Sequence, residues 1–128
     1  MILDTSAILA ILFREPEEDD FLGKIGSAPM VGIGAPTLVE TAIVLGARLG
    51  ERASTMLFAM VDRVGIVVVS FDPSHWQLAT DVWLRFGWGC HLAALNFGDC
   101  LAYATARLAN RPLLCKSEDF SKTDLVLA

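Results

Sequence analysis

The sequence predicts an α/β fold, a three-layer α/β/α sandwich around a central, mostly parallel sheet of four or five strands. Short runs of aliphatic and β-branched residues alternate along the whole chain with longer segments whose apolar residues recur at helical spacing. Such alternation is typical of parallel strands joined by helices that cover both faces of a sheet. With 128 residues, the chain is expected to form a single domain over residues 1–128.

The expected strands are short and almost wholly apolar, which is typical of parallel strands buried on both faces. Glycines mark their limits, because Gly34 closes the second strand and Gly65 precedes the third. The candidates, of which the last is a possible edge strand, are Ile2–Asp4, Met30–Ile33, Ile66–Val69, Pro112–Cys115 and Leu125–Leu127.

The segments between the strands carry start and stop signals of helices. Thr37 is expected to cap the third helix, with Glu40 three residues further on, and Asp72 is expected to cap the fifth, with Pro73 in its first turn. The expected helices are Thr5–Phe13, Glu17–Ser27, Pro36–Leu49, Glu51–Val64, Asp72–Phe86 and Asn96–Ala109, with a turn or short helix at Ser117–Ser121. The side chains expected to face the core are Phe21, Leu22 and Ile25 in the second helix and Met56, Leu57, Met60, Val61 and Val64 in the fourth.

Composition limits the class of protein. Hydrophobic residues make up 54% of the chain and charged residues 20%, which indicates a globular protein. No signal peptide is expected, because Met1 leads directly into the first expected strand, and the longest apolar run, Ala7–Phe13, is too short to span a membrane. Cys90, Cys100 and Cys115 are odd in number and show no CxxC spacing, so we expect reduced thiols in the cytoplasm and no zinc site.

Three carboxylates stand alone in apolar sequence. Asp99 follows the N-cap candidate Asn96 and precedes a small, apolar helix, so it is expected to enter the interior without a Lys or Arg within one turn. One alternative is a capping box, in which Asp99 only bonds back to Asn96. Asp4 and Glu40 lie in similar apolar surroundings. A shared divalent cation explains all three, because Mg²⁺ prefers carboxylate oxygens.

The predicted topology brings these acids together. Asp4 ends the first strand, Glu40 and Asp99 lie near helix starts, and the stretch 116–119 follows the fourth strand. Sites in open α/β sheets lie at the carboxyl ends of the strands. A bound cation also weakens the objection that the net charge of −5 raises against a nucleic-acid partner.

The same stretches carry a resemblance to a known family. They are Met-Ile-Leu-Asp-Thr-Ser-Ala, the Glu within Thr-Leu-Val-Glu-Thr-Ala, Leu-Asn-Phe-Gly-Asp-Cys-Leu-Ala-Tyr-Ala, and Leu-Leu-Cys-Lys-Ser-Glu-Asp-Phe-Ser-Lys-Thr-Asp. In this order they resemble PIN-domain ribonucleases, and more narrowly the VapC toxins of bacterial toxin–antitoxin pairs. The resemblance runs from end to end of the chain.

The resemblance implies a PIN-like fold and a Mg²⁺- or Mn²⁺-dependent endoribonuclease. By motif, the metal ligands and catalytic acids are Asp4, Glu40, Asp99 and Asp119, and Ser6 supports Asp4 or a metal-bound water. Glu118 and Asp124 are close rivals for the place of the fourth acid. In this chemistry the ion lowers the pKa of a bound water and stabilises charge on the phosphate, and RNA is the substrate.

One loop departs from the family pattern. Many relatives have Gly-Lys-Gly followed by a basic residue and His, whereas this chain has Gly-Trp-Gly-Cys-His at 87–91. Trp88 is a candidate to stack on an unpaired base or, alternatively, to pack on the rim or on a partner chain. His91 is a candidate phosphate contact or a structural residue. Lys116 is expected to contact phosphate or to pair with Glu118.

The resemblance also implies protein partners. VapC-like proteins are inhibited by a small antitoxin, whose tail would cross the helices at Glu17–Ser27 and Thr37–Val64 and bring a basic side chain to the acids. The acidic cluster between Glu15 and Asp20 is expected to be a solvated helix face, and it suits a basic amphipathic segment. A homodimer is also expected, because 54% hydrophobic residues is high for a lone small domain.

Two other classes fit the coarse pattern. A signalling receiver domain has similar size and topology, but it needs paired acids after the first strand, where this chain has Asp4 alone. A non-catalytic binding module would use the acids only as helix caps. Three isolated carboxylates in apolar surroundings argue against that alternative.

Overall fold

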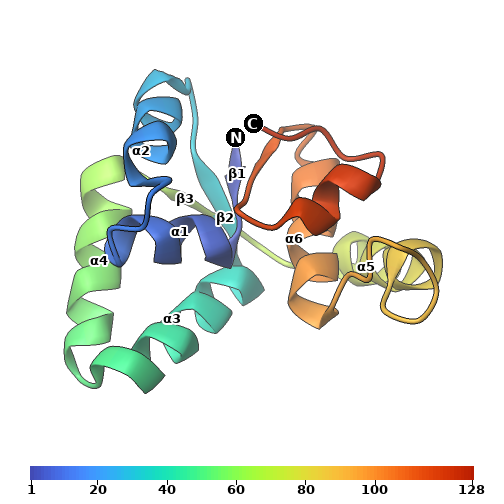
Figure 1. Cartoon of the computed structure of the whole chain (residues 1–128), viewed down its shortest axis with the longest axis horizontal. Coiled ribbons are helices and arrows are strands. Elements are labelled where there is room, and N and C mark those ends of the chain that lie inside the picture. Colours follow the sequence, from blue (N-terminus) through green and yellow to red (C-terminus); the bar gives the residue numbers. More distant parts are fainter.

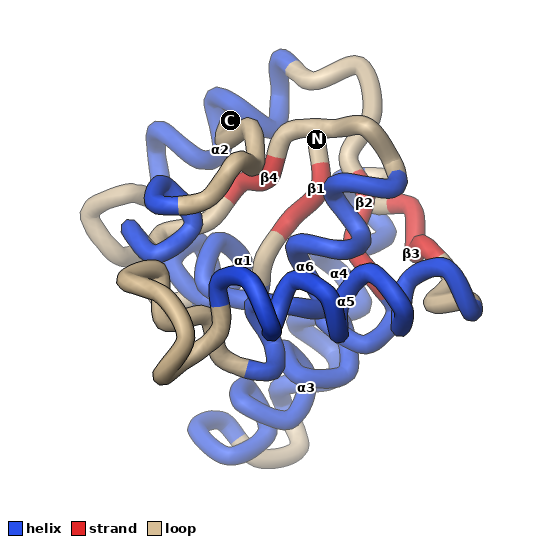
Figure 2. The backbone as a smooth tube through the Cα atoms, turned by 90° about the vertical axis from the view of Figure 1, so that its right-hand side faces the viewer, coloured by secondary structure: helices blue, strands red, loops and turns tan.

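The structure, a computed structural model that describes residues 1–128, is built on a four-stranded parallel sheet with the strand order β3-β2-β1-β4. Ile2 of β1 pairs with Gly32 of β2 on one side and with Leu113 of β4 on the other. Figure 2 shows the strands side by side. Their bounds are β1 Ile2–Leu3, β2 Gly32–Gly34, β3 Val67–Val69 and β4 Leu113–Leu114. The predicted fold is confirmed, although the expected fifth strand shrinks to a single bridge between Leu113 and Leu127.

Six α-helices and one 3₁₀-helix surround the sheet (Figure 1). Helices α1, α2 and α4 lie on one side and α5 and α6 on the other, while α3 contacts α1, α4 and α6. The bounds are α1 Thr5–Leu12, α2 Glu18–Ser27, α3 Ala35–Leu49, α4 Arg52–Val64, α5 Pro73–Phe86, α6 Phe97–Leu108 and η1 Glu118–Lys122. None of them is long and apolar enough to cross a membrane.

The sheet separates two apolar cores. Successive side chains of a strand point to opposite faces. Leu3 accordingly packs with α1–α4, whereas its neighbour Ile2 packs with Leu113 and the buried residues of α5 and α6. The strands β1 and β4 therefore fix the positions of the segments that follow them, and these segments carry Asp4 and Lys116.

Helix α3 begins differently from the prediction. It starts at Ala35, directly after β2, and Gly34 is its N-cap without any side-chain bond. Thr37 is therefore not a cap but a buried residue inside the first turn, and Glu40 lies in the second turn. The expected Thr37–Glu40 capping box was wrong, because the chain enters the helix without an intervening loop. The expected caps at Asp72 and Asn96 are confirmed.

Some residues expected in the core lie at the surface. Strand β3 is at the open edge of the sheet, and its Val67 and Val68 side chains remain 52% and 45% exposed. An apolar sequence cannot distinguish an edge strand from a central one. Leu22 and Met56 are also exposed, whereas Phe21, Ile25, Leu57 and Met60 are buried as predicted. These exposed side chains give α2, α4 and β3 an apolar outer surface.

Candidate functional site

Asp4 lies at the end of β1 and forms the N-cap of α1. Its Oδ2 accepts hydrogen bonds from the backbone N–H of Ser6, at 3.0 Å, and from the Ser6 hydroxyl. The side chain is buried, and burial raises the pKa of Asp4 against the opposing effect of the Ser6 hydrogen bonds, while the charge of Glu40 raises it further. Ser6 therefore holds one oxygen of Asp4 in place.

Glu40 faces Asp4 from the second turn of α3. The Thr5 hydroxyl donates to Oε2 of Glu40 at 2.6 Å. Thr5 is buried, and the hydroxyl of buried Thr41 lies 3.2 Å from its Oγ1. A small group of buried threonines thus lies beneath the two acids, and Thr5 links the segment after β1 to α3.

Asp99 lies in the first turn of α6, where it completes a capping box with Asn96. Its Oδ2 accepts from the Asn96 N–H at 2.8 Å, and its own N–H donates to Asn96 Oδ1 at 2.9 Å. Burial nevertheless raises the pKa of Asp99 to about 6, because the Asn96 hydrogen bond only partly opposes it and the charges of Asp4, Asp119 and Glu40 add to it. Asp99 therefore caps α6 and also lies close enough to the other three acids for their charges to raise its pKa.

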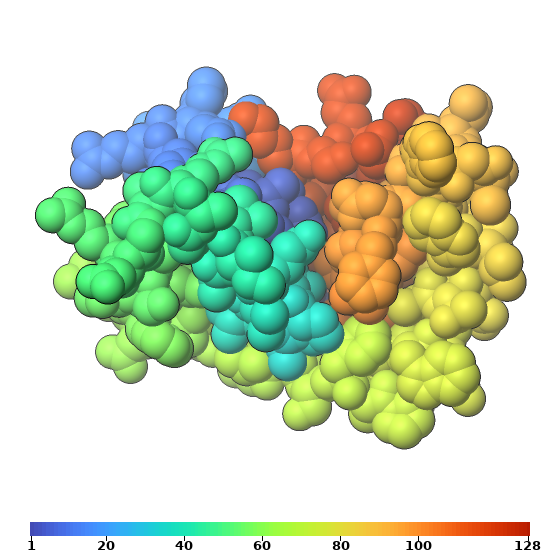
Figure 3. All heavy atoms as spheres, turned by 90° about the horizontal axis from the view of Figure 1, so that it is seen from below, coloured from blue at the N-terminus to red at the C-terminus, as the bar shows by residue number.

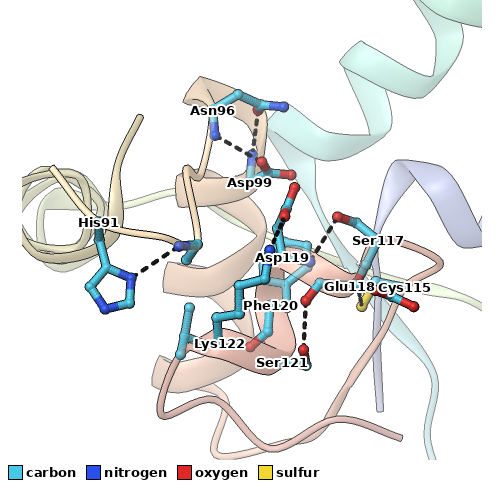
Figure 4. A network of polar contacts seen from close by, with 12 residues as sticks. His91, Asn96, Asp99, Cys115, Ser117, Glu118, Asp119, Phe120, Ser121 and Lys122 are labelled. Carbon is cyan, nitrogen blue, oxygen red and sulfur yellow. Dashed lines mark hydrogen bonds and ion pairs between the residues drawn. The ribbon is translucent and has the colours of Figure 1, made fainter. Parts of the chain in front are cut away.

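Asp119 lies in η1, which Ser117 caps through its hydroxyl. Figure 4 shows the Asp99 and Asp119 carboxylates facing the same space between α6 and η1. Oδ1 of Asp119 accepts from Lys122 Nζ at 3.1 Å. The two rivals differ, because Glu118 is exposed and Asp124 is bonded by Arg85 and Tyr103. Of the three candidates for the fourth acid, only Asp119 contributes to the raised pKa of Asp99.

The four acids gather at the carboxyl edge of the sheet. Seen from that side, the N-terminal segment lies at the bottom of a depression bordered by α3, the first turn of α6 and the segment after β4 (Figure 3). The acids come from four segments that lie far apart in the sequence. Such a cluster of like charges is costly unless a cation binds or a proton is shared.

The donor set fits a hard divalent cation. In each carboxylate a single oxygen takes the protein hydrogen bonds, namely Oδ2 of Asp4, Oε2 of Glu40, Oδ2 of Asp99 and Oδ1 of Asp119. The other oxygen of each remains for a ligand, and carboxylate oxygens suit Mg²⁺ and Mn²⁺. No three acidic, cysteine or histidine side chains are drawn together tightly enough to enclose an ion as they stand. An ion would therefore have to pull these mutually repelling groups closer.

The candidate RNA contacts Trp88, His91 and Lys116 make no hydrogen bond or ion pair with the four acids. Trp88 is 73% exposed in the loop before α6, and His91 accepts from the Ala93 N–H at 3.0 Å, apart from the acids in Figure 4. Lys116 does not pair with Glu118. Its Nζ lies 2.6 Å from Glu15 and 3.1 Å from Glu17.

Sequence reasoning missed three contributors. Thr5 holds Glu40, and Glu15 and Glu17 hold Lys116 rather than forming a purely solvated face. In addition, the Ser6 hydroxyl accepts from the Lys116 N–H at 2.9 Å, which ties the segment after β4 to Asp4. The only advance signal was the position of Thr5 and Ser6 beside Asp4.

The sequence model of the PIN domain matches residues 1–125 of this chain. The chain belongs to the PIN-domain family. It is 42% identical over 126 residues to ribonuclease VapC36 of Mycobacterium tuberculosis, covering 98% of this chain and 91% of that protein. It is 37% identical to the ribonuclease VapC of Mycolicibacterium smegmatis, covering 98% of this chain and 97% of that protein. These identities place this PIN domain among the VapC ribonucleases.

Solved structures agree with this fold. The crystal structure of Mycobacterium tuberculosis VapC20, a sarcin–ricin loop cleaving toxin, superposes on this PIN domain with a TM-score of 0.80 at 21% identity, covering 99% of this chain and 97% of that one. A toxin–antitoxin complex from Klebsiella pneumoniae gives a TM-score of 0.73 at 16% identity, covering 99% and 95%. At the level of the family, the predicted PIN-domain ribonuclease of the VapC kind is confirmed.

Proposed function

We propose that this PIN domain cleaves RNA with a Mg²⁺ or Mn²⁺ ion held by Asp4, Glu40, Asp99 and Asp119. One observation carries the proposal. Four carboxylates from distant segments share one electrostatic neighbourhood, and each keeps an oxygen that no protein hydrogen bond occupies. The VapC relatives named above are ribonucleases, which supports the same function.

The residues of the chain prepare the site for this chemistry. Ser6 fixes Oδ2 of Asp4, Thr5 fixes Oε2 of Glu40 and the Asn96 N–H fixes Oδ2 of Asp99. Because these carboxylate oxygens are already held in place, less side-chain entropy is lost when they bind an ion. When bound, the ion supplies an activated water and stabilises charge on the phosphate oxygens. RNA is the substrate, with Trp88 as the base-stacking candidate and His91 and Lys116 as phosphate-contact candidates.

Cleavage of a labelled single-stranded RNA tests the proposal. The metal-free protein in EDTA should not cut, and added Mn²⁺ should restore cleavage. Asp119→Asn should lose cleavage, whereas its exposed neighbour Glu118→Gln should keep it. Cleavage at full rate in EDTA by a nuclease-clean preparation would overturn the metal mechanism.

An antitoxin is the proposed protein partner. Helix α2 carries Glu18, Asp19 and Asp20 in its first turn, beside the exposed Leu22. Leu22 borders a hollow of about 590 Å³ between the ends of α2 and α4. An acidic, partly apolar surface suits a basic amphipathic segment. The Klebsiella pneumoniae neighbour is itself a toxin–antitoxin complex, which supports this partner.

The antitoxin of a VapC-like protein is usually encoded beside it, so binding of the protein from the neighbouring gene tests the partner. It should bind this PIN domain and suppress cleavage. Asp19→Lys reverses an exposed charge of α2 and should weaken the complex, whereas Asp81→Lys on α5 makes the same change on the other side of the sheet and should not. If both variants bind the partner with equal affinity, the partner does not bind at the acidic face of α2.

A homodimer is proposed on the α3–α6–α5 side. Two hollows of about 440 Å³ and 420 Å³ adjoin there and share Phe97 and Leu101. Their walls include the exposed Ile43, Trp76 and Trp83. Exposed apolar surface of this kind marks an interface. Light scattering should give a dimer for the parent and for Leu92→Asp, and a monomer for Ile43→Asp.

Two circumstances favour a reducing compartment, the cytoplasm, as the place of action. The substrate proposed is RNA, and all three cysteines are free, with Cys100 buried and Cys90 exposed. Labelling of the exposed thiol in intact cells should show it reduced.

A further inference from the structure

The Glu40 carboxylate is held from two sides by groups that are not themselves candidate ligands. On one side the Thr5 hydroxyl donates to Oε2 at 2.6 Å, while its other acceptor, the Thr37 carbonyl, is 3.4 Å away. A hydroxyl has one proton, and the shorter contact to a charged acceptor takes it. Thr5 therefore fixes one named oxygen of Glu40.

On the other side, the first turn of α6 lies against the same carboxylate. A β-carbon at Gly98 would overlap Oε1 of Glu40 and lie 3.0 Å from its Cδ. Any other residue at position 98 would push the carboxylate away. Gly98 directly precedes Asp99, so the helix turn that carries Asp99 also leaves room for the Glu40 carboxylate.

We propose that Thr5 is a positioning residue for Glu40 and that Gly98 supplies the space in which the positioned carboxylate sits. This inference rests on the proposed metal site. Glu40 is the only glutamate among the four acids and has one more rotatable bond than an aspartate, so it loses more freedom when it is fixed. The hydrogen bond to Oε2 fixes it in advance and leaves Oε1 for the ion. Because Thr5 follows Asp4 directly, the same short segment both carries Asp4 and holds the Glu40 carboxylate in position.

Calorimetric titration of the metal-free protein with Mn²⁺ tests the role of Thr5 without relying on activity. Thr5→Val keeps the shape but removes the hydroxyl, and the dissociation constant for Mn²⁺ should rise about tenfold, the effect of losing one hydrogen bond to a charged group. Thr5→Ser keeps the donor and should stay within about twofold of the parent. Thr105→Val is the matched control, because Thr105 is also buried but donates to the Leu101 carbonyl.

Gly98→Ala supplies a second test, because it should not lower the stability of the fold but should weaken Mn²⁺ binding. Alanine favours a helix over glycine, so the melting temperature of the metal-free protein should stay the same or rise. The displaced Glu40 carboxylate should nevertheless weaken Mn²⁺ binding. The Mn²⁺ concentration for half-maximal RNA cleavage should rise in Thr5→Val and Gly98→Ala alike, while KM for RNA at saturating Mn²⁺ should stay unchanged.

The outcomes separate this inference from the proposed function. If the parent binds Mn²⁺ and Thr5→Val and Gly98→Ala bind it equally well, the positioning role is wrong and the metal site stands. The positioning role is also wrong if Thr105→Val loses as much affinity for Mn²⁺ as Thr5→Val. If the parent itself binds no Mn²⁺, the proposed function fails and this inference fails with it.

Discussion

Asp99 caps the helix that it belongs to through Oδ2, which accepts from the Asn96 N–H at 2.8 Å, and keeps Oδ1 free of any hydrogen bond from the protein. Capping and metal binding are therefore compatible in one carboxylate, since each needs a different oxygen. A capping box by itself accounts for the hydrogen bond but not for the neighbouring charges of Asp4, Asp119 and Glu40. The substitution Asp99→Asn separates the two roles.

Asp99→Asn should stabilise the metal-free protein. The change removes one of several crowded like charges, and the asparagine oxygen can still accept from the Asn96 N–H. The melting temperature in EDTA should rise by a few degrees. If Asp99 were only a cap, the change would instead cost up to about 1 kcal/mol and leave cleavage intact.

The stability of the metal-free protein should depend on pH in a defined direction. The pKa of Asp99 is raised to about 6, so between the ordinary value of 3.8 and that pKa the folded state holds a proton that the unfolded state does not. Stability should therefore rise as the pH is lowered from about 7.5 to about 5.5, and the raised pKa of Asp4 acts in the same direction. Melting curves across this range should show a smaller gain for Asp99→Asn. A parent whose melting temperature falls throughout this range would contradict the raised pKa.

Removing the Ser6 hydroxyl should loosen both Asp4 and the segment after β4. In Ser6→Ala, Asp4 loses a donor and the Lys116 N–H loses its acceptor. The expected cost is about 1–3 kcal/mol in the free energy of unfolding, together with weaker Mn²⁺ binding. Urea unfolding and calorimetry measure the two effects. Ser27→Ala on α2, where the hydroxyl bonds only the Lys24 carbonyl, is the control and should change neither by a comparable amount.

Freeing Lys116 should strengthen RNA binding. Glu15 and Glu17 form ion pairs with Lys116 Nζ and raise the pKa of Lys116. The paired ammonium group is then not available to bind a phosphate. Glu15→Gln with Glu17→Gln should tighten binding of single-stranded RNA in EDTA by about three- to tenfold and steepen its salt dependence. The control pair Glu18→Gln and Asp19→Asn removes the same charge without touching Lys116. Fluorescence anisotropy that gives equal gains for both pairs would show that only net charge matters.

Much of the fold follows from local chemistry. Gly50 and Gly65 do end α3 and α4, and Asp72 and Asn96 do cap α5 and α6, because turns and caps are decided by residues close in sequence. The cap at Thr37 failed because Gly34 ends β2 and begins α3 at once. The exposure of Val67 depends on strand order, which no local pattern contains.

The candidate site divides in the same way. The acids could be predicted because a lone carboxylate in apolar sequence is costly and because the motifs occur in a recognisable order. The partners of Glu40 and Lys116 could not be predicted. Thr5 is 35 residues from Glu40, and Lys116 is 101 residues from Glu15, so only the folded chain shows these contacts.

The most direct test of the metal site is a calorimetric titration of Mn²⁺ into metal-free parent and Asp99→Asn, with RNA cleavage measured on the same samples. We expect saturable binding by the parent, together with cleavage, and the loss of both in Asp99→Asn. A variant that binds Mn²⁺ and cuts RNA like the parent would contradict the proposed metal site.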